Sequence, residues 1–555
     1  MTHKIADLIA RRITEGLTRK SVTKCSEWAL KYRVLGAPYP GPWSFDRHPW
    51  LREMMDSEAE MNIGQKAAQL GYTEAVLNRT LFNVDIRSLD CLYILPSWKP
   101  DASDFSSARF APALEMSRHL REIFSDVSNV GHKRAGSANL YIRGSHARSQ
   151  LKSIPVAQIV IDEKDEMTQS NIPLAFERQS GQVVRETWQI STPTHPNYGI
   201  NKDFLQSSQN HFFFRCPCCS RLTELEFPEC LVVTAENVTD PTLKDSYIHC
   251  KECRGKLPHE TKIEWLSNRN KSHWVESFSD RDWKGWYVNQ LYSPVIEPWK
   301  IAETAIKAQS DPAEETELYN SKGGLPHTVK GAGVLDEEIE NCISGYRMFY
   351  SYHGGRIVTM GIDVGYPNLH YEIDEWILPP PGTPVVDINQ YAKCRALNVG
   401  TVSNFDACDD LLSSFRVNFT VVDAQPERRQ ALSFANKHYG RVRLCSYEQG
   451  ITGKAIFLDS NEPRVKVDRT SWLDLSLGRF KNKTIGLPGD IPLEYRQHIK
   501  AQVRVYEKDR HGNPTGRYIT PSGEDHYGHA RNYSEIALPL ACQAASPVNI
   551  EKSVF

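Results

Sequence analysis

Residues 66–73 read Lys-Ala-Ala-Gln-Leu-Gly-Tyr-Thr and directly precede a helical pattern. The usual phosphate loop is G-x-x-x-x-G-K-[ST], in which backbone N–H groups cradle phosphates, the lysine reaches the outer phosphate oxygens and the hydroxyl binds Mg²⁺. Gly71 and Thr73 fit the second glycine and the hydroxyl of this pattern. Tyr72 occupies the lysine position, and Lys66 occupies the first-glycine position. Because a lysine at the start of the loop can reach the same phosphates, the stretch is either a deviant phosphate loop or an ordinary turn before a helix.

A short apolar run, Gln158-Ile-Val-Ile-Asp-Glu163, ends in two adjacent carboxylates. A parallel strand delivers such residues to the carboxyl edge of a sheet, where ligands bind. There Asp162 would hold Mg²⁺, and Glu163 would orient or deprotonate the attacking water. The alternative is a strand that ends in a solvated acidic turn, because Lys-Asp-Glu follows at 164–166. A further strand pattern at 188–194 ends in hydroxyl residues suited to sensing a γ-phosphate, and three such signals in this order favour an ATPase.

The composition is that of a globular protein, with 40% hydrophobic and 24% charged residues in a chain of 555. Sixty-six Lys and Arg face 68 Asp and Glu, and the net charge of −2 excludes a generally basic, histone-like protein but not a basic groove. No uninterrupted apolar run approaches the roughly 20 residues that span a bilayer, and the start lacks the apolar core of a secretion signal. We therefore expect a soluble, intracellular protein.

Five of the 13 cysteines lie within 38 residues, and four of them form two C-x-x-C pairs. Such pairs turn thiolates toward one ion, and four thiolates satisfy tetrahedral Zn²⁺. The spacing predicts a structural zinc ribbon, with His249 or Cys230 as possible substitutes and Cys218 as a spare. The expected ligands are Cys216, Cys219, Cys250 and Cys253.

Two further strand patterns end in aspartates. Residues 357–363 deliver Asp363, and residues 419–423 deliver Asp423. Two strand-borne aspartates with a third on a helix are typical of RNase H-like nucleases, whose carboxylates bind two metal ions that clamp a phosphodiester.

The third carboxylate is expected at Asp525, where Glu-Asp-His at 524–526 opens a helix. His529 lies four residues on and shares its face. Ser-Gly-Glu-Asp at 522–525 also fits a capping box, in which Asp525 would serve the helix rather than a metal. The basic segment 464–483 is predicted to contact the DNA backbone beside this nuclease site.

These motifs, in this order, resemble the large terminase subunit of tailed bacteriophages, specifically the lambda-type group, over nearly the whole chain. The matching stretches are GPWSFDRHPWLREMM (41–55), the loop with its early lysine, IVIDEKDEM (159–167), QISTPT (189–194), the cysteine pairs, LYNSKGGLP (318–326), GIDVG (361–365) and DHYGHARNY (525–533).

The resemblance implies an α/β fold: a P-loop (RecA/ASCE-like) ATPase domain with a parallel sheet and a zinc-ribbon insertion, followed by an RNase H-like nuclease domain. The boundaries we expect are an N-terminal arm at 1–45, the ATPase domain at 46–320 with its insertion at about 211–260, a linker at 321–350, the endonuclease domain at 351–545 and a tail at 546–555.

The resemblance also implies the function of a DNA-packaging motor. It would hydrolyse ATP to push double-stranded DNA into a procapsid and cut concatemeric DNA, in the host cytoplasm and away from membranes. The arm would bind the small terminase subunit, the tail would dock on the portal protein, and copies of the chain would form a ring there.

Residue roles follow from the same resemblance. ATP and Mg²⁺ would be held by Lys66, Gly71, Tyr72, Thr73 and Asp162, with Glu163 catalysing hydrolysis. Mg²⁺ or Mn²⁺ would be bound by Asp363, Asp423 and Asp525, which cut DNA. Position 365 is Gly where a polar residue is expected, and His529 stands where relatives often carry an acid, so the third ligand departs most from the pattern.

Two rival functions fit parts of the sequence. A cellular ATP-dependent helicase-nuclease would use the same two sites to unwind and degrade DNA. A structural adaptor with an inactive nuclease half would show no metal-dependent cutting.

Overall fold

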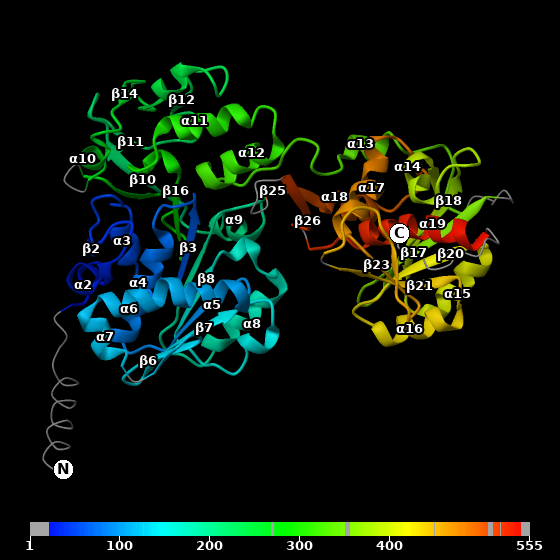
Figure 1. Ribbon diagram of the computed structural model, residues 1–555, viewed down its shortest axis with the longest axis horizontal. Helices are drawn as coiled ribbons and strands as arrows, with labels where there is room; N and C mark the ends of the chain where they lie inside the picture. Colours follow the sequence, from blue (N-terminus) through cyan, green and yellow to red (C-terminus); the bar gives the residue numbers. More distant parts are fainter. Residues whose placement is uncertain are drawn as a thin grey trace, which may run out of the picture. The chain divides into compact units, whose positions relative to one another are not determined.

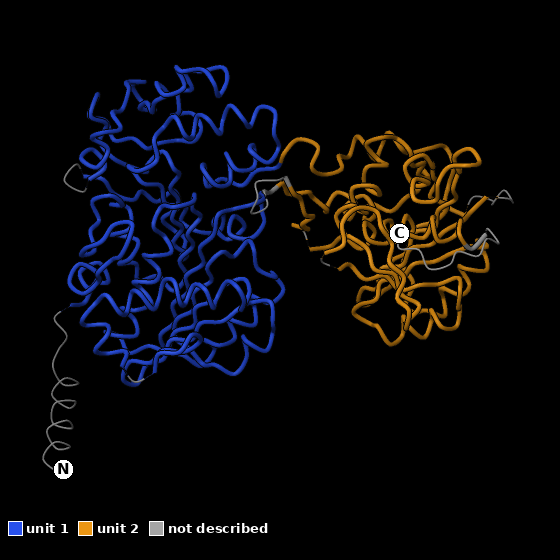
Figure 2. Tube along the Cα trace, in the orientation of Figure 1, with its two compact units in different colours: residues 1–328 blue, residues 329–555 orange. Residues whose placement is uncertain are grey.

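The computed structural model forms two compact units, Met1–Thr328 and Val329–Phe555 (Figure 2). It describes residues 22–125, 127–267, 271–349, 356–448, 450–508, 514–521 and 523–545. Residues 1–21 of the predicted arm and the whole predicted tail lie outside these residues. Within them, no helix has the length and apolar character needed to cross a membrane.

An 11-stranded sheet forms the centre of the first unit, in the order β11-β10-β16-β3-β9-β8-β4-β7-β6-β5, with β15 paired to β10 (Figure 1). The pairs from β10 to β7 along this order are all parallel, so their carboxyl ends meet at one edge. The strands are β3 (Met61–Lys66), β4 (Cys91–Leu95), β5 (Val127–Asn129), β6 (His132–Ala135), β7 (Ala138–Gly144), β8 (Gln158–Asp162), β9 (Glu186–Ser191), β10 (Asn210–Arg215), β11 (Leu222–Thr223), β15 (His273–Glu276) and β16 (Lys284–Val288).

Helices cover both faces of this sheet because its central strands are buried on both sides. In β4, Tyr93 joins the core that contains α4, and its neighbours Leu92 and Ile94 join a second core on the opposite face with α8. The helices of the unit are α2 (Cys25–Tyr32), α3 (Leu51–Met55), α4 (Tyr72–Asp85), α5 (Ser103–Phe105), α6 (Ala111–Met116), α7 (Arg118–Ile123), α8 (Ile172–Phe176), α9 (Gly199–Phe204), α10 (Lys262–Leu266), α11 (Pro298–Lys307) and α12 (Pro312–Thr316).

The strand patterns predicted at 158–163 and 188–194 are confirmed as β8 and β9. The predicted cysteine-rich insertion differs at its start, because β10 already pairs with β16 in the main sheet. The alternating Phe212 and Phe214 of β10 are buried in the main core, which holds this strand in the sheet. The separate part is a small sheet of β12 (Leu231–Val232), β13 (Tyr247–His249) and β14 (Lys256–Leu257).

A buried carboxylate, Glu186 at the start of β9, ties α4 to the sheet. It accepts hydrogen bonds from Arg79, Asn83 and Arg87 on or next to α4. It also accepts from Gln158 of β8 and from the Trp188 indole. Although burial raises the pKa of Glu186, the Arg79 guanidinium overcomes this and holds it below its usual value.

The second unit is built on an eight-stranded sheet in the order β22-β23-β21-β20-β17-β18-β19-β24. The pairs β17–β18 and β18–β19 are antiparallel, whereas β17–β20 and β20–β21 are parallel. The strands are β17 (Ile357–Val364), β18 (Leu369–Ile377), β19 (Lys393–Val402), β20 (Phe419–Asp423), β21 (Val442–Tyr447), β22 (Phe457–Leu458), β23 (Arg464–Val467) and β24 (Ile485–Gly486), with a separate hairpin of β25 (Val503–Lys508) and β26 (Pro514–Ile519).

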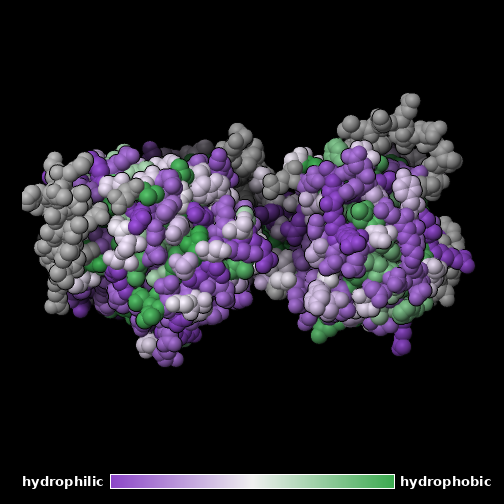
Figure 3. Space-filling model, turned by 90° about the horizontal axis from the view of Figure 1, so that it is seen from below, coloured by the Kyte–Doolittle hydropathy of each residue, from purple (hydrophilic) through white to green (hydrophobic). Residues whose placement is uncertain are grey.

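The last helix, α19, packs across β17, β18 and β20 of this sheet (Figure 1). The side chains of Ala530, Tyr533, Ala537 and Leu540 on this helix are buried. The helices of the unit are α13 (Asp336–Glu340), α14 (Ile388–Tyr391), α15 (Phe405–Ser414), α16 (Arg428–Lys437), α17 (Arg469–Lys481), α18 (Leu493–Ala501) and α19 (His526–Ala545). Hydrophilic residues dominate the face of each unit seen in Figure 3, as expected where the apolar residues form internal cores.

We predict that Glu186→Ala destabilises the first unit by about 3–5 kcal/mol, because it leaves the Arg79 guanidinium buried without its partner. Chemical denaturation followed by tryptophan fluorescence measures this loss. Glu58→Ala is the matched control, since Glu58 contacts the same Arg79 at 3.3 Å but is 67% exposed. The control should lose about 1 kcal/mol or less. Equal losses in the two variants would contradict the role given to Glu186.

Candidate functional site

The deviant phosphate loop joins strand β3 directly to helix α4. Lys66 is the last residue of β3, and Tyr72 is the first residue of α4. Gly71, between loop and helix, has φ 82°, a left-handed conformation that favours glycine. This strand–loop–helix arrangement is the one expected of a phosphate loop rather than of an isolated surface turn.

Lys66 and the two carboxylates of the acidic strand meet at the carboxyl edge of the sheet. Lys66 Nζ lies 2.8 Å from Glu163 Oε1, although one strand, β9, separates β3 from β8. Burial alone would lower the pKa of Lys66, but Glu163 and then Asp162 raise it above its usual value. The predictions made for Lys66 and Glu163 therefore concern side chains in direct contact.

Asp162 is buried and carries an oxygen suited to a metal. Burial, and next the charge of Glu163, raise the pKa of Asp162 to about 6. Its Oδ2 accepts from the Tyr93 hydroxyl at 2.7 Å, while its Oδ1 has no hydrogen-bond partner among the described residues. The Thr73 hydroxyl faces the same carboxylate and lowers its pKa. A hydroxyl and an unpartnered carboxylate oxygen fit the hard oxygen ligands that Mg²⁺ prefers.

The Tyr72 side chain is placed away from this edge. It is 1% exposed, and its ring packs so close to Gly64 of β3 that a Cβ there would stand 2.9 Å from it. The lysine position of the usual motif is thus filled by a core residue, and only the Tyr72 backbone N–H remains for a nucleotide.

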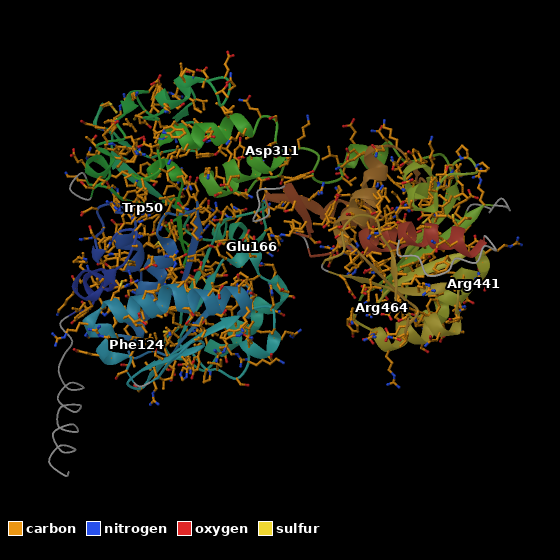
Figure 4. All side chains as sticks on the ribbon, in the orientation of Figure 1. Trp50, Phe124, Glu166, Asp311, Arg441 and Arg464 are labelled. Atoms are coloured by element: carbon orange, nitrogen blue, oxygen red, sulfur yellow. The ribbon has the colours of Figure 1, made fainter. Side chains whose placement is uncertain are left out.

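A later segment of the chain holds the phosphate loop in place. The π-helical turn η10 (Glu317–Gly323) accepts the Ala68 N–H through the Ser321 carbonyl at 2.8 Å. Gly324 follows, with φ 63°, and a Cβ at this position would stand 2.6 Å from the Ala67 nitrogen. On the other side, the Trp50 indole donates to the Leu70 carbonyl at 3.0 Å (Trp50 is labelled in Figure 4).

The turn after the acidic strand is buried rather than solvated. Asp165 is 1% exposed and accepts hydrogen bonds from the backbone N–H and hydroxyl of Thr194, both at 2.9 Å. It also accepts from the Ile200 N–H at 2.6 Å, and Lys164 contacts Asp203. The alternative of a solvated acidic turn is therefore wrong, and Asp165 fixes the hydroxyl-bearing end of QISTPT beside Glu163.

Four cysteine sulfur atoms cluster within 4.8 Å of one another, and they are those of Cys216, Cys219, Cys250 and Cys253. One pair lies in the turn between β10 and β11, and the other lies between β13 and β14. In each turn a backbone N–H points at a sulfur, from Cys218 to Cys216 and from Glu252 to Cys250, both at 3.3 Å. Four converging sulfurs at this spacing fit tetrahedral Zn²⁺.

The other candidates for this ion lie elsewhere. Cys218 is exposed and faces the Lys256 carbonyl, and His249 Nε2 lies 3.2 Å from the Arg254 guanidinium. Cys230 is buried in the main core outside the cluster.

In the second unit, Asp363 and Asp423 lie near each other at the ends of the adjacent parallel strands β17 and β20. Burial, and next the charge of Asp363, raise the pKa of Asp423 to about 7. Two carboxylates that repel each other in a buried setting are stabilised by a shared cation. This pair therefore fits a divalent metal with oxygen ligands.

Asp525 lies just before α19 and is engaged in local hydrogen bonds. It accepts from the Thr520 hydroxyl at 2.6 Å and from Gln502 at 3.2 Å, and its Oδ2 lies 3.2 Å from His529 Nε2. Burial alone would raise the pKa of Asp525, but the His529 hydrogen bond and the other donors bring this pKa far below its usual value. Among the described residues, it does not join Asp363 in a cluster of ligand atoms within 4.8 Å.

Two histidines that sequence reasoning missed join Asp363 instead. His526 Nδ1 lies 2.8 Å from Asp363 Oδ2, and His370 of β18 stacks on His526 at 4.4 Å between ring centroids. Burial, and next the charge of His526, lower the pKa of His370 to about 4. His370 faces Asp363 directly in the antiparallel register of β17 and β18. Recognition of the tight turn at 365–368 as a hairpin would have predicted this pair.

The predicted DNA contact of segment 464–483 is wrong for Arg479. This side chain is 3% exposed and makes two 2.5 Å hydrogen bonds to the buried Glu535 of α19. Because α17 packs against α19, Arg479 stabilises the interior of the second unit instead of facing solvent. Arg464 and Lys466 of the same segment contact Asp459 and Glu448.

Residues 37–274 match the family model described as "Phage terminase large subunit gpA, ATPase domain". This part of the first unit is therefore similar to the ATPase domain of phage terminase large subunits. A comparison with curated proteins found no match.

Solved structures similar to this chain include large terminases of phages. The ATPase domain from Thermus phage P74-26 is 12% identical, covers 52% of this chain and 94% of its own, and has a TM-score of 0.30. The large terminase of another thermophilic bacteriophage is 10% identical, with coverages of 89% and 98% and a TM-score of 0.29. The nuclease of thermophilic phage G20c, with bound magnesium, is 10% identical, with coverages of 37% and 98% and a TM-score of 0.24. TM-scores this low add nothing to the family match.

We predict that Gly324→Ala weakens ATP binding by this chain at least about tenfold, equivalent to about 1.4 kcal/mol. The added Cβ would push on the backbone of the phosphate loop. Gly331→Ala is the matched control, because Gly331 has φ 79° but open space around it, so it carries the same backbone strain without the clash. Titration with a fluorescent ATP analogue measures both affinities. Equal affinities would contradict the close packing of Gly324 against the phosphate loop.

Proposed function

We propose that this chain is the large terminase subunit of a lambda-type tailed bacteriophage, which packages double-stranded DNA into a procapsid and cuts it. The Lys66–Glu163 contact at the carboxyl edge of a parallel sheet is the observation that carries the motor part. The fold of the second unit and its paired aspartates support the nuclease part.

In the motor, Lys66, Gly71, Thr73 and the Tyr72 backbone would hold ATP, and Thr73 with Asp162 would hold its Mg²⁺. When bound there, Mg²⁺ would supply positive charge that neutralises the phosphates. Lys66 must leave Glu163 to contact a phosphate, and this frees the Glu163 carboxylate to take a proton from the attacking water. Asp165 keeps Glu163 and the end of QISTPT together while this happens.

In the second unit, three antiparallel strands followed by parallel ones support an RNase H-like nuclease. Asp363 and Asp423 would bind Mg²⁺ or Mn²⁺, which clamps the attacking and leaving oxygens of a phosphodiester. Asp525 is the proposed third carboxylate, and it must give up its hydrogen bond with His529 or Gln502 to reach a metal. His526 orients Asp363 through its 2.8 Å contact.

The remaining parts follow the same proposal. The four clustered cysteines would bind a structural Zn²⁺ that fixes the two hairpin turns. The arm would recruit the small terminase subunit and the tail would dock on the portal protein, where a ring of copies acts in the host cytoplasm.

Translocation on intact duplex tests the motor. Blunt duplex DNA carrying a triplex-forming third strand is incubated with ATP and the chain, with a fluorescent label on each strand. We expect release of the third strand while the duplex stays paired, and loss of this release by at least about 100-fold in Glu163→Gln, because the amide cannot accept the proton. If the chain alone does not release the third strand, the same assay is repeated on procapsids, and that result decides whether the chain translocates on duplex DNA.

Separation of the duplex strands in that assay would identify a helicase, the rival function, and would overturn the packaging proposal. Glu166→Gln is the control, since Glu166 follows in the same acidic turn but outside the Lys66 contact.

Cutting tests the nuclease. Asp363→Asn and Asp423→Asn should each reduce Mn²⁺-dependent cleavage of plasmid DNA at least about 100-fold, because each removes a ligand charge. Asp409→Asn is the control, since Asp409 pairs with Lys437 and His438 on the surface of the same unit. Cleavage that survives both substitutions would show that the aspartate pair does not cut DNA.

A further inference from the structure

A second cluster of possible metal ligands lies in the second unit, beside the proposed nuclease residues. It consists of His370 on β18 with Glu494 and His498 on α18, and their ligand atoms lie within 4.8 Å of one another. Glu494 and His498 are four residues apart on α18, so they project from the same face of the helix. Nothing in the proposed ATPase or nuclease chemistry uses Glu494 or His498.

The two histidines are buried, and the His498 nitrogen that faces Glu494 has no hydrogen-bond partner. His370 and His498 are 8% and 3% exposed. Within the described residues, His498 Nε2 lacks a hydrogen-bond partner, while His370 presents its Nε2 to the same Glu494. A buried polar atom left without a partner costs free energy, so such atoms call for an explanation such as an ion.

The ligand atoms have nearly the spacing that a tetrahedral ion imposes. Glu494 Oε1 lies 3.9 Å from His370 Nε2 and 3.9 Å from His498 Nε2. Glu524 Oε2 lies 3.7 Å from His498 Nε2 and is 75% exposed, so it can move in as a fourth ligand. Ligands at 2.0–2.1 Å from a tetrahedral ion stand roughly 3.3 Å apart. Around such an ion the two distances from Glu494 would therefore shorten by about half an ångström.

We propose that His370, His498 and Glu494, with Glu524 as the fourth ligand, bind a divalent transition-metal ion of the Zn²⁺ type. Imidazole nitrogen suits such ions, whereas Mg²⁺ prefers oxygen. Binding through His498 Nε2 leaves the ring proton on Nδ1, and the Tyr527 amide nitrogen, 3.5 Å away, makes too weak a hydrogen bond to oppose this.

The site would join three elements that are far apart in the sequence: β18, α18 and the segment just before α19. His526 begins α19, stacks on His370 and contacts Asp363. The ion would thus be structural and would hold His370 in the place that His526 needs. It differs from the aspartate pair, which offers only oxygen, and from the cysteine cluster in the first unit.

Zinc content tests this proposal directly. The full chain is dialysed against trace Zn²⁺ in the presence of excess Mg²⁺, which fills oxygen sites, and bound zinc per chain is measured by elemental analysis. We expect His498→Asn to lower the content by one ion per chain. Cys218→Ser, which alters an exposed thiol outside both clusters, should leave the content unchanged.

Two further variants make the result decisive. Glu494→Gln changes a side chain that is 53% exposed, so it should spare the fold while weakening zinc binding at this site at least about tenfold. His526→Gln should keep the ion, because His526 is not one of the four ligands. Unchanged zinc in both His498→Asn and Glu494→Gln would overturn the proposal. Loss of the ion in His526→Gln would also overturn it, since the ion would then belong to the Asp363 group.

Discussion

The buried carboxylate of Glu186 is the constraint on which the first site depends. It binds α4 through Arg79, β8 through Gln158 and its own strand through Trp188. These are the elements that carry Thr73, Asp162 and the QISTPT segment. Glu186 lies at the amino end of β9, and the site lies at the carboxyl edge. Fixing the three elements at one end limits how far their functional ends can separate at the other.

A buried charged network also joins a helix to the sheet in the second unit, but its central residue is an arginine surrounded by carboxylates. The buried Arg531 of α19 contacts Glu372 and Asp374 of β18 and Glu535 of its own helix. Arg531 thereby fixes the helix that carries His526 to the strand that carries His370. Such networks are costly to bury and stabilise little in total, but removing one member leaves a charge without a partner. These networks therefore favour one packing of the helix on the strand over alternative packings.

Sequence reasoning reached the residues at the ends of strands and missed those that meet across the sheet. Asp162, Asp363 and Asp423 all follow apolar runs, and parallel strands bring such ends to one edge. The contact between Lys66 and Glu163 depends on the strand order, which local patterns do not contain. His370 depends on hairpin register, and the burial of Arg479 depends on a partner 56 residues away. A basic residue looks the same in sequence whether it meets DNA or a buried glutamate.

The hydrogen bond from the Ala68 N–H to the Ser321 carbonyl connects the phosphate loop to a later segment of the chain. Ser321 and Gly324 lie only a few residues before Val329, where the second unit begins. A phosphate oxygen that accepted the Ala68 N–H would have to replace the Ser321 carbonyl. Phosphate binding and the position of the segment that leads to Val329 would then be coupled through a single backbone hydrogen bond.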